Sequence, residues 1–175
     1  MKIEIPNDPV RAGALARDPK TPIEILAELA KSDLMFLRED VAHHPNTSPE
    51  LLMNLLPDTL NSENDRRMAT ALVTNPITPE PALSKLSQLV TPEMVNGSRR
   101  ENWAWERLVV ELVTHKNCPS MDALALLKSE GLTKKIKTRI AERSSSEHIL
   151  NTLLTDPSEV VRRAAAASLS KTENY

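Results

Sequence analysis

The chain contains little glycine, few aromatic residues and a single cysteine, and each scarcity excludes a class of protein. Among 175 residues there are 3 glycines, 1 Phe, 1 Tyr and 2 tryptophans, while hydrophobic residues make up 40%. The core must therefore be built from Leu, Ala, Val, Ile and Met. Little glycine argues against nucleotide-binding loops, whose backbone must approach phosphate closely. The single cysteine, Cys118, excludes an intramolecular disulfide and any four-thiolate zinc or iron–sulfur site.

Long hydrophobic runs and a strong charge of one sign are also missing. No stretch reaches the ~18 apolar residues of a membrane span, and the first ten residues lack the apolar core of a signal peptide. Lys and Arg number 22 against 24 Asp and Glu, a net charge of -2. We therefore expect a cytoplasmic protein that has no membrane partner and does not coat nucleic acid indiscriminately.

Proline is abundant by contrast, with 13 residues, and it marks a repeated phrase. Clear copies begin at Asp18 (DPKTP), His44 (HPNTSP) and Asn75 (NPITP), and each precedes an apolar run. Weaker copies occupy residues 112–119 and 140–146, and the segment from residue 156 resembles the first half of a sixth unit. Proline cannot continue a preceding helix, whereas a hydroxyl residue followed by proline is typical of a helix start. Each phrase therefore predicts the end of one short helix and the beginning of the next.

The hydroxyl residues of the phrase are expected to cap the helices that follow them. Three of them precede a glutamate by three residues, the spacing of a capping box. Helix starts are predicted within two residues of Thr21, Thr47, Thr78 and Ser144. The leucines of the apolar runs share an i, i+3 pattern and are predicted to form one buried ladder: Leu26, Leu29, Leu52, Leu55, Leu83, Leu86, Leu124, Leu127, Leu150 and Leu153.

A second element with a basic residue lies between the phrases, as in Leu37-Arg38 and Val161-Arg162. Two short helices cannot bury an apolar face alone, so neighbouring units must stack. Alternating β-branched runs are absent. The sequence predicts an all-α fold, an α-solenoid of about five to six short two-helix repeats. We expect a single domain over residues 1–175, with an enlarged repeat around residues 87–107.

These phrases resemble the repeats of the leucine-rich repeat variant family, which read roughly Asn-Pro-x-Thr-Pro, then a Leu-rich helix, then a Val-Arg element. The ending from Asp156 to Leu169 is equally similar to HEAT-like repeats. The resemblance implies a right-handed superhelix in which α- and 3₁₀-helices alternate. Some family members carry an N-terminal cysteine cluster with an iron–sulfur centre. This chain has no such cluster, so neither an iron–sulfur cluster nor another cofactor is expected.

The enlarged repeat carries the candidate binding residues. Extra residues in one unit of a solenoid usually form a loop on one face, and Trp and Arg are enriched at binding hot spots. The candidates are Arg99, Arg100, Trp103, Trp105 and Arg107. Two tryptophans spaced two residues apart point to different sides of a helix. The alternative to a binding surface is therefore that one indole packs in the core while the arginines are solvated. We expect at least one of the two indoles to be partly exposed, with one of the three arginines within contact distance on the same face.

Two further patterns bear on function. Residues 99–143 hold 10 basic and 6 acidic side chains, net +4, which a phosphate backbone, an acidic partner or simply solvent could accommodate. The adjacent His43 and His44 cannot readily chelate one metal, and His115 with Cys118 lacks a third ligand. Because no catalytic motif is present either, no metal and no catalytic residue are predicted.

A non-enzymatic scaffold that binds a partner protein or peptide is therefore the leading hypothesis. One alternative is a HEAT-like nucleic-acid-binding protein of the DNA-repair type, since HEAT-like DNA glycosylases combine a basic groove with tryptophans and a carboxylate. Another is a helical accessory subunit of a larger complex. Steep salt dependence of duplex DNA binding would separate the nucleic-acid hypothesis from the other two.

Overall fold

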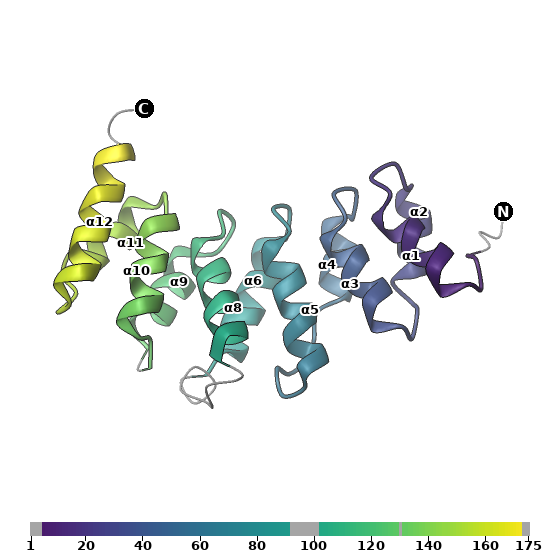
Figure 1. Cartoon of the computed structure of the whole chain (residues 1–175), viewed down its shortest axis with the longest axis horizontal. Helices are drawn as coiled ribbons and strands as arrows, with labels where there is room; N and C mark the ends of the chain where they lie inside the picture. The colour runs from purple at the N-terminus through teal and green to yellow at the C-terminus, as the bar shows by residue number, and fades with distance from the viewer. Residues whose placement is uncertain (1–4, 92–101, 130, 173–175) are drawn as a thin grey trace. The chain divides into compact units, whose positions relative to one another are not determined.

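All regular structure in the computed structural model is helical, and the model describes residues 5–91, 102–129 and 131–172. Eleven helices and no strand are found in these ranges, which confirms the all-α prediction (Figure 1). The helices are α1 (Pro9–Arg17), α2 (Ile23–Leu29), α3 (Met35–His43), α4 (Pro49–Asn54), α5 (Glu63–Thr74), α6 (Glu80–Leu89), α8 (Asn102–Thr114), α9 (Ser120–Lys128), α10 (Lys134–Arg143), α11 (Glu147–Leu153) and α12 (Glu159–Thr172). No helix in the described ranges is long and apolar enough to cross a membrane.

The chain divides into two compact units, residues 1–82 and 83–175, and α6 begins in the first and continues into the second. In the first unit α1, α3 and α5 pack in a row, and α2 packs against α1 and α3 (Figure 1). In the second unit α8, α10 and α12 form the row, while α9 and α11 pack against its helices. Within each unit, successive helix pairs stack as in an α-solenoid. The single domain and the handedness of the superhelix stay predictions.

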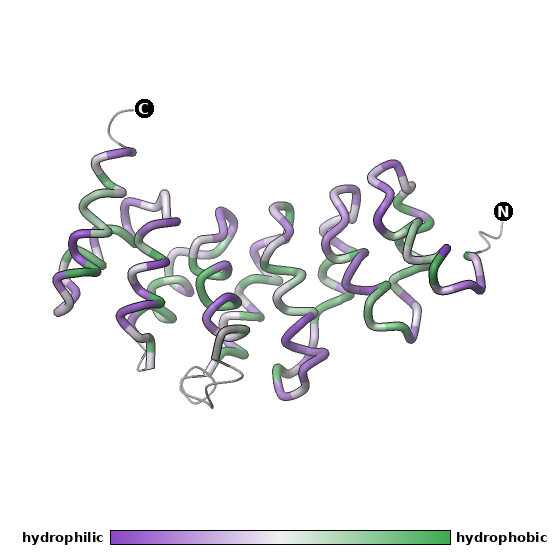
Figure 2. Tube along the Cα trace, in the orientation of Figure 1, coloured by the Kyte–Doolittle hydropathy of each residue, from purple (hydrophilic) through white to green (hydrophobic). Residues whose placement is uncertain are grey.

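The predicted leucine ladder is buried at nine of its ten positions, with leucines from 0 to 9% exposed. Figure 2 shows hydrophobic positions concentrated where the helices of a unit lie against one another. The exception is Leu55, which is half-buried just beyond the end of α4. Burying leucine side chains contributes about 1.5–3 kcal/mol each, so this ladder supplies much of the driving force for stacking.

The helix starts agree with the prediction at three of four phrases. Helices α2, α4 and α6 begin two residues after Thr21, Thr47 and Thr78, but α11 begins three residues after Ser144. The second helix of each pair is short but α-helical, so the 3₁₀ alternation implied by the family resemblance is not found in the described ranges. The apolar residues of these helices recur at i, i+3, which suits an α-helical face.

The predicted capping role is wrong for Thr21 and Thr47, because neither hydroxyl caps the helix that follows it. The hydroxyl of Thr21 donates to the carbonyl of Leu15 at 2.6 Å, and that of Thr78 donates to Leu72 at 2.6 Å. Thr47 likewise donates to Val41. Each hydroxyl thus satisfies a carbonyl near the end of the preceding helix, one of the groups that a helix end leaves without a partner. The cap of α4 is instead the next residue, whose hydroxyl accepts the amide of Leu51.

Candidate functional site

The predicted binding segment is described only in part. Arg99 and Arg100 lie outside the described residues, and so does the side chain of Trp103, whose backbone lies in the first turn of α8. Arg107 is exposed on α8. A partner-binding role for these four residues stays a prediction.

Trp105 is a correction to the predicted surface, because its side chain is only 3% exposed. It lies on the face of α8 that also buries Leu108, Val109 and Leu112. The helical periodicity places residues 105, 108, 109 and 112 on one side, and a large apolar ring on that side enters the core. Trp105 therefore packs the second unit and offers no binding surface, as the one-core alternative anticipated.

The loops of successive repeats are joined by side-chain hydrogen bonds that the sequence did not reveal. The ring of His44 lies 2.7 Å from the carbonyl oxygen of Asp18, and the amide of Asn46 donates to the carbonyl of Pro19 at 2.8 Å. One repeat later, Asn75 donates to the carbonyl of Ala42 at 2.7 Å. Both His44 and Asn75 are buried, at 2% exposure. These bonds fix the loop after α3 to the loop after α1, and the loop after α5 to the end of α3.

A second series of contacts crosses the outer surface of the helix rows. In the first unit Arg17 of α1 pairs with Asp40 of α3 at 2.9 Å, and Arg67 of α5 pairs with Glu39 of α3 at 2.6 Å. Because the arginines are more than half exposed, each pair adds less than about 1 kcal/mol to stability. The pairs do, however, hold these charges at defined positions.

Most of the basic side chains of α10 are also paired. Arg143 forms two hydrogen bonds of 2.7 Å with Glu111, and Lys135 pairs with Glu106 at 2.9 Å. Arg139 approaches the same Glu106 at 3.6 Å. Lys137 contacts the carboxylate of Asp156 at 2.8 Å. The cluster of positive charge seen in the sequence is thus largely neutralised by acidic partners from α8 and from the loop before α12.

His44, His115 and Cys118 have structural roles in the loops between helices. Nδ1 of His115 accepts the amide of Asn117 at 3.1 Å, as Nδ1 of His44 accepts that of Asn46. The amide of Cys118 donates to the carbonyl of His115, so Cys118 occupies the position that threonine holds in the earlier phrases. Among the described residues, no group of three or more His, Cys, Asp or Glu could hold a metal ion.

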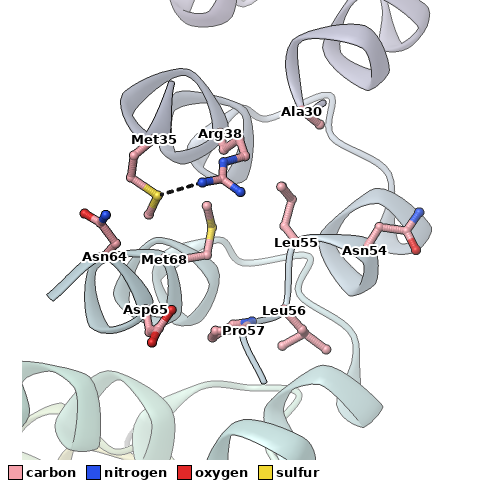
Figure 3. Close-up of a pocket in the computed structure, with 10 residues that line it drawn as sticks. All are labelled: Ala30, Met35, Arg38, Asn54, Leu55, Leu56, Pro57, Asn64, Asp65 and Met68. Carbon is pink, nitrogen blue, oxygen red and sulfur yellow. Dashed lines mark hydrogen bonds between the residues drawn. The ribbon is translucent and has the colours of Figure 1, made fainter. Parts of the chain in front are cut away.

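A small pocket lies in the first unit between α3, α5 and the chain that follows α4 (Figure 3). Its volume is about 190 Å³. Polar atoms make up most of its exposed lining. The polar lining residues are Arg38, Asn54, Asn64 and Asp65, and the apolar ones are Ala30, Met35, Leu55, Leu56, Pro57 and Met68. Sequence reasoning missed this pocket, because the residues that form it lie in three separate segments and carry no shared motif.

Arg38 is the one cation of the pocket lining, and its partners are few. Its Nη2 lies 3.6 Å from the sulfur of Met35, a weak acceptor, and its Nε is buried with no hydrogen-bond partner. No carboxylate in the described ranges lies within ion-pair distance of it. The guanidinium therefore retains donor capacity inside a partly buried site.

Asp65, on the same lining, is occupied by the start of α5. Its carboxylate accepts the backbone amide of Ser62 and the hydroxyl of Thr59, both at 3.1 Å, which completes a capping box. The hydrogen bonds from Ser62 are the main cause that lowers the pKa of Asp65 below its usual value. Asp65 is thus an ionised cap residue, held by α5 rather than by Arg38.

Comparison with known proteins agrees with the repeated phrases. Residues 11–72, which run from α1 into α5, match the family model of the Leucine Rich Repeat Variant domain. This confirms, for that part of the chain, the family that the phrases resemble. No curated protein and no solved structure gives a significant match to the chain.

Proposed function

We propose that this chain, whose residues 11–72 match a Leucine Rich Repeat Variant domain, is a non-enzymatic scaffold that binds a partner protein or peptide. The observation that carries this proposal is the series of hydrogen bonds between successive repeats, from the loop residue His44 to Asp18 and from the loop residue Asn75 to Ala42 and His44. Loops fixed in this way present their side chains in a set arrangement, which lowers the ordering cost of binding.

The paired charges of α10 favour a protein partner over nucleic acid. A phosphate backbone is bound by unneutralised Lys and Arg, whose counterions are released on binding. Here Lys135, Lys137 and Arg143 each contact a carboxylate at 2.7–2.9 Å. These contacts weaken the positive potential that a duplex would meet, whereas a protein partner does not depend on it.

For the partner surface we propose Arg99, Arg100, Trp103 and Arg107, and we no longer include Trp105. Exposed Arg107 supports this choice, because it lies on the side of α8 opposite the buried face. Guanidinium and indole groups suit an acidic, partly aromatic partner through bidentate pairing and stacking.

Capture of partners on the immobilised chain tests this function. We expect a protein that is retained after nuclease treatment and at raised salt, and that is lost when Arg99, Arg100 and Arg107 are all replaced by Ala. A matched control replaces three exposed cations elsewhere, Arg11, Arg163 and Lys171, and should still capture it. Binding only to duplex DNA, with affinity that falls steeply with salt, would instead establish the nucleic-acid alternative.

A further inference from the structure

A second hollow of the first unit lies between α1 and the first turn of α3, and we call it the α1–α3 groove. Its lining residues are Pro9, Val10, Gly13, Arg17 and Phe36, and its volume is about 230 Å³. The surface that this lining exposes is almost entirely apolar, and Val10 is 80% exposed. The groove is therefore an apolar surface that a partner can reach without any rearrangement of the core.

The absence of a side chain at Gly13 shapes this groove. Glycine in a helix interior costs about 1 kcal/mol relative to alanine. A Cβ atom at this position would lie 3.3 Å from Cε2 of Phe36 and 3.9 Å from Cδ2 of Leu37. Gly13 thus allows the Phe36 ring to approach the backbone of α1 closely, and the ring and the bare backbone together line the hollow.

The equivalent position between α3 and α5 is bridged by an ion pair. The three helices can be aligned on their C-cap residues, which are Asp18, His44 and Asn75. In this alignment Gly13 of α1 corresponds to Glu39 of α3, and Phe36 of α3 corresponds to Arg67 of α5. Glu39 and Arg67 pair at 2.6 Å. A glycine and a phenylalanine thus replace this pair between α1 and α3, and the groove stays open there.

The charge that a ligand meets in the groove is positive. Arg17 is the one charged residue of the lining, and its side chain is 66% exposed. Its Nη2 pairs with Asp40 at 2.9 Å, but the Asp40 side chain is only 20% exposed and does not line the groove. Among the described residues Arg17 has no other polar contact. Its remaining N–H donors are therefore available to a carboxylate of a ligand.

The size of the groove limits what it can hold. At about 230 Å³ it is smaller than the ~300–1,000 Å³ of sites that enclose a whole small molecule or cofactor, so it suits one side chain. Gly13 and Arg17 are four residues apart on α1, which is about 6 Å along the helix axis. Side chains two positions apart on an extended chain share one face and are separated by about 6.7 Å. An apolar residue followed two positions later by an acidic residue matches this arrangement.

We infer that the α1–α3 groove binds an extended segment of a partner protein, with an apolar side chain beside Gly13 and Phe36 and a carboxylate on Arg17. The inference rests on the proposed function in that the ligand is part of a partner polypeptide. It adds a chemically defined contact in the first unit, apart from the surface proposed on α8.

Three synthetic peptides test the inference on the native chain. The probe is acetyl-Ser-Gly-Leu-Ser-Glu-Gly-Ser amide, and two controls replace its Glu with Gln or its Leu with Ala. Amide NMR signals of Gly13, Arg17 and Phe36 should shift with the probe. Binding should weaken roughly two- to fivefold without the glutamate, as for an exposed ion pair, and roughly tenfold without the leucine, through lost burial.

Several outcomes of this comparison would overturn the inference. One is the absence of shifts at the groove with the probe, and another is binding that is unaffected by either replacement. Shifts at the same residues that depend on the concentration of the chain alone would also do so, because a second copy of the chain would then occupy the groove.

Two variants test the contact with the carboxylate. Arg17→Gln should remove the difference between the glutamate and glutamine peptides. Arg67→Gln is the matched control and should preserve it, because Arg67 is also about half exposed and paired with a carboxylate but lies outside the groove. An unchanged difference in Arg17→Gln would contradict the inference, and if this variant does not fold, the peptide comparison on the native chain still decides. Partner capture without peptide binding defeats only this inference, whereas peptide binding without capture defeats only the proposed function.

Discussion

The ring of His44 joins two repeats by a hydrogen bond of 2.7 Å to the carbonyl oxygen of Asp18, 26 residues earlier in the chain. Nδ1 of the same ring accepts the amide of Asn46, so Nε2 carries the proton and donates to Asp18. Asn75 combines the same two roles one repeat later, because its side chain accepts the amide of Ile77 and donates to Ala42. Two different side chains thus do one task at one repeat position.

Replacing His44 tests whether these two hydrogen bonds are the reason for a histidine at this position. His44→Asn should reduce stability by less than about 1 kcal/mol, because asparagine can accept from the turn and donate to the preceding repeat. His44→Leu should reduce it by about 1–3 kcal/mol, since the buried carbonyl and amide then lose their partner. Urea denaturation of the two variants measures the difference. Equal losses would show that only the volume of the side chain matters.

Replacing Thr47 tests the corrected role of the phrase threonine. Thr47→Val keeps the shape of the side chain but removes the hydroxyl that donates to Val41. Val41 keeps the amide of His44 as a second donor, so the loss should be near 1 kcal/mol. Urea denaturation checks it, with Thr47→Ser as the control that keeps the hydroxyl. A Thr47→Val variant as stable as the native chain would contradict the assigned bond.

The repeated phrase predicted where helices end and begin better than it predicted what its side chains do. Proline fixes the boundary through its own ring, so helix starts near Thr21, Thr47 and Thr78 follow from local chemistry. A threonine hydroxyl can either cap the helix that follows it or donate to a carbonyl at the end of the preceding helix. Which of the two it does depends on its burial, and burial is set by the packing of the repeats. Thr47 is 0% exposed, so its hydroxyl cannot donate to water, and it donates to the carbonyl of Val41 instead.

The contact between Asp156 and Lys137 makes part of the stability of the second unit pH-dependent. Burial acts to raise the pKa of Asp156, but hydrogen bonds from Lys137 and the Ser158 amide, with the nearby Lys137 and Arg162 charges, lower it below its usual value. A carboxyl with a depressed folded pKa stabilises the fold above its unfolded pKa of about 4 and loses this contribution as pH falls through the folded value.

We therefore expect Asp156→Asn to be less stable than the native chain near neutral pH, with the difference shrinking as pH falls below about 4. Asparagine can still accept the Ser158 amide, so the variant isolates the charge. Thermal melts at a series of pH values measure the difference. Glu159→Gln is the control, because this carboxylate pairs with Arg163 on the exposed surface. A difference that stays constant with pH would contradict the assignment.

The leucine ladder gives a direct test of the packing. Leu52 of α4 is fully buried, and Leu52→Ala should reduce stability by about 2–5 kcal/mol through lost burial and a remaining cavity. Its neighbour Met53, at 36% exposure, faces away, and Met53→Ala should change stability by less than about 0.5 kcal/mol. Urea denaturation compares the two, and similar losses would show that the helix is turned differently.

The pocket and the ion pairs could not be predicted from the sequence, because both depend on how segments distant in the chain pack together. The sequence shows Arg38 and Arg66 at equivalent positions, yet one enters a pocket and the other binds its own loop. Residues 55–62 form a longer connection before α5 than residues 30–34 form before α3, and this geometry arises only on folding. Likewise, the basic residues of α10 look like a positively charged segment in the sequence. In the structure Glu106 and Glu111 of α8 pair with two of them.

Tryptophan fluorescence tests the division of the binding segment between core and surface. Trp103→Phe leaves Trp105 as the sole indole, and because its ring is 3% exposed, its emission should be blue-shifted and resist quenching by acrylamide. Trp105→Ala should reduce stability by about 3–5 kcal/mol, as large buried rings do. Arg107→Ala is the matched control on the opposite side of α8 and should leave the melting temperature nearly unchanged. A readily quenched Trp105, or a Trp105→Ala variant as stable as Arg107→Ala, would return this indole to the partner surface.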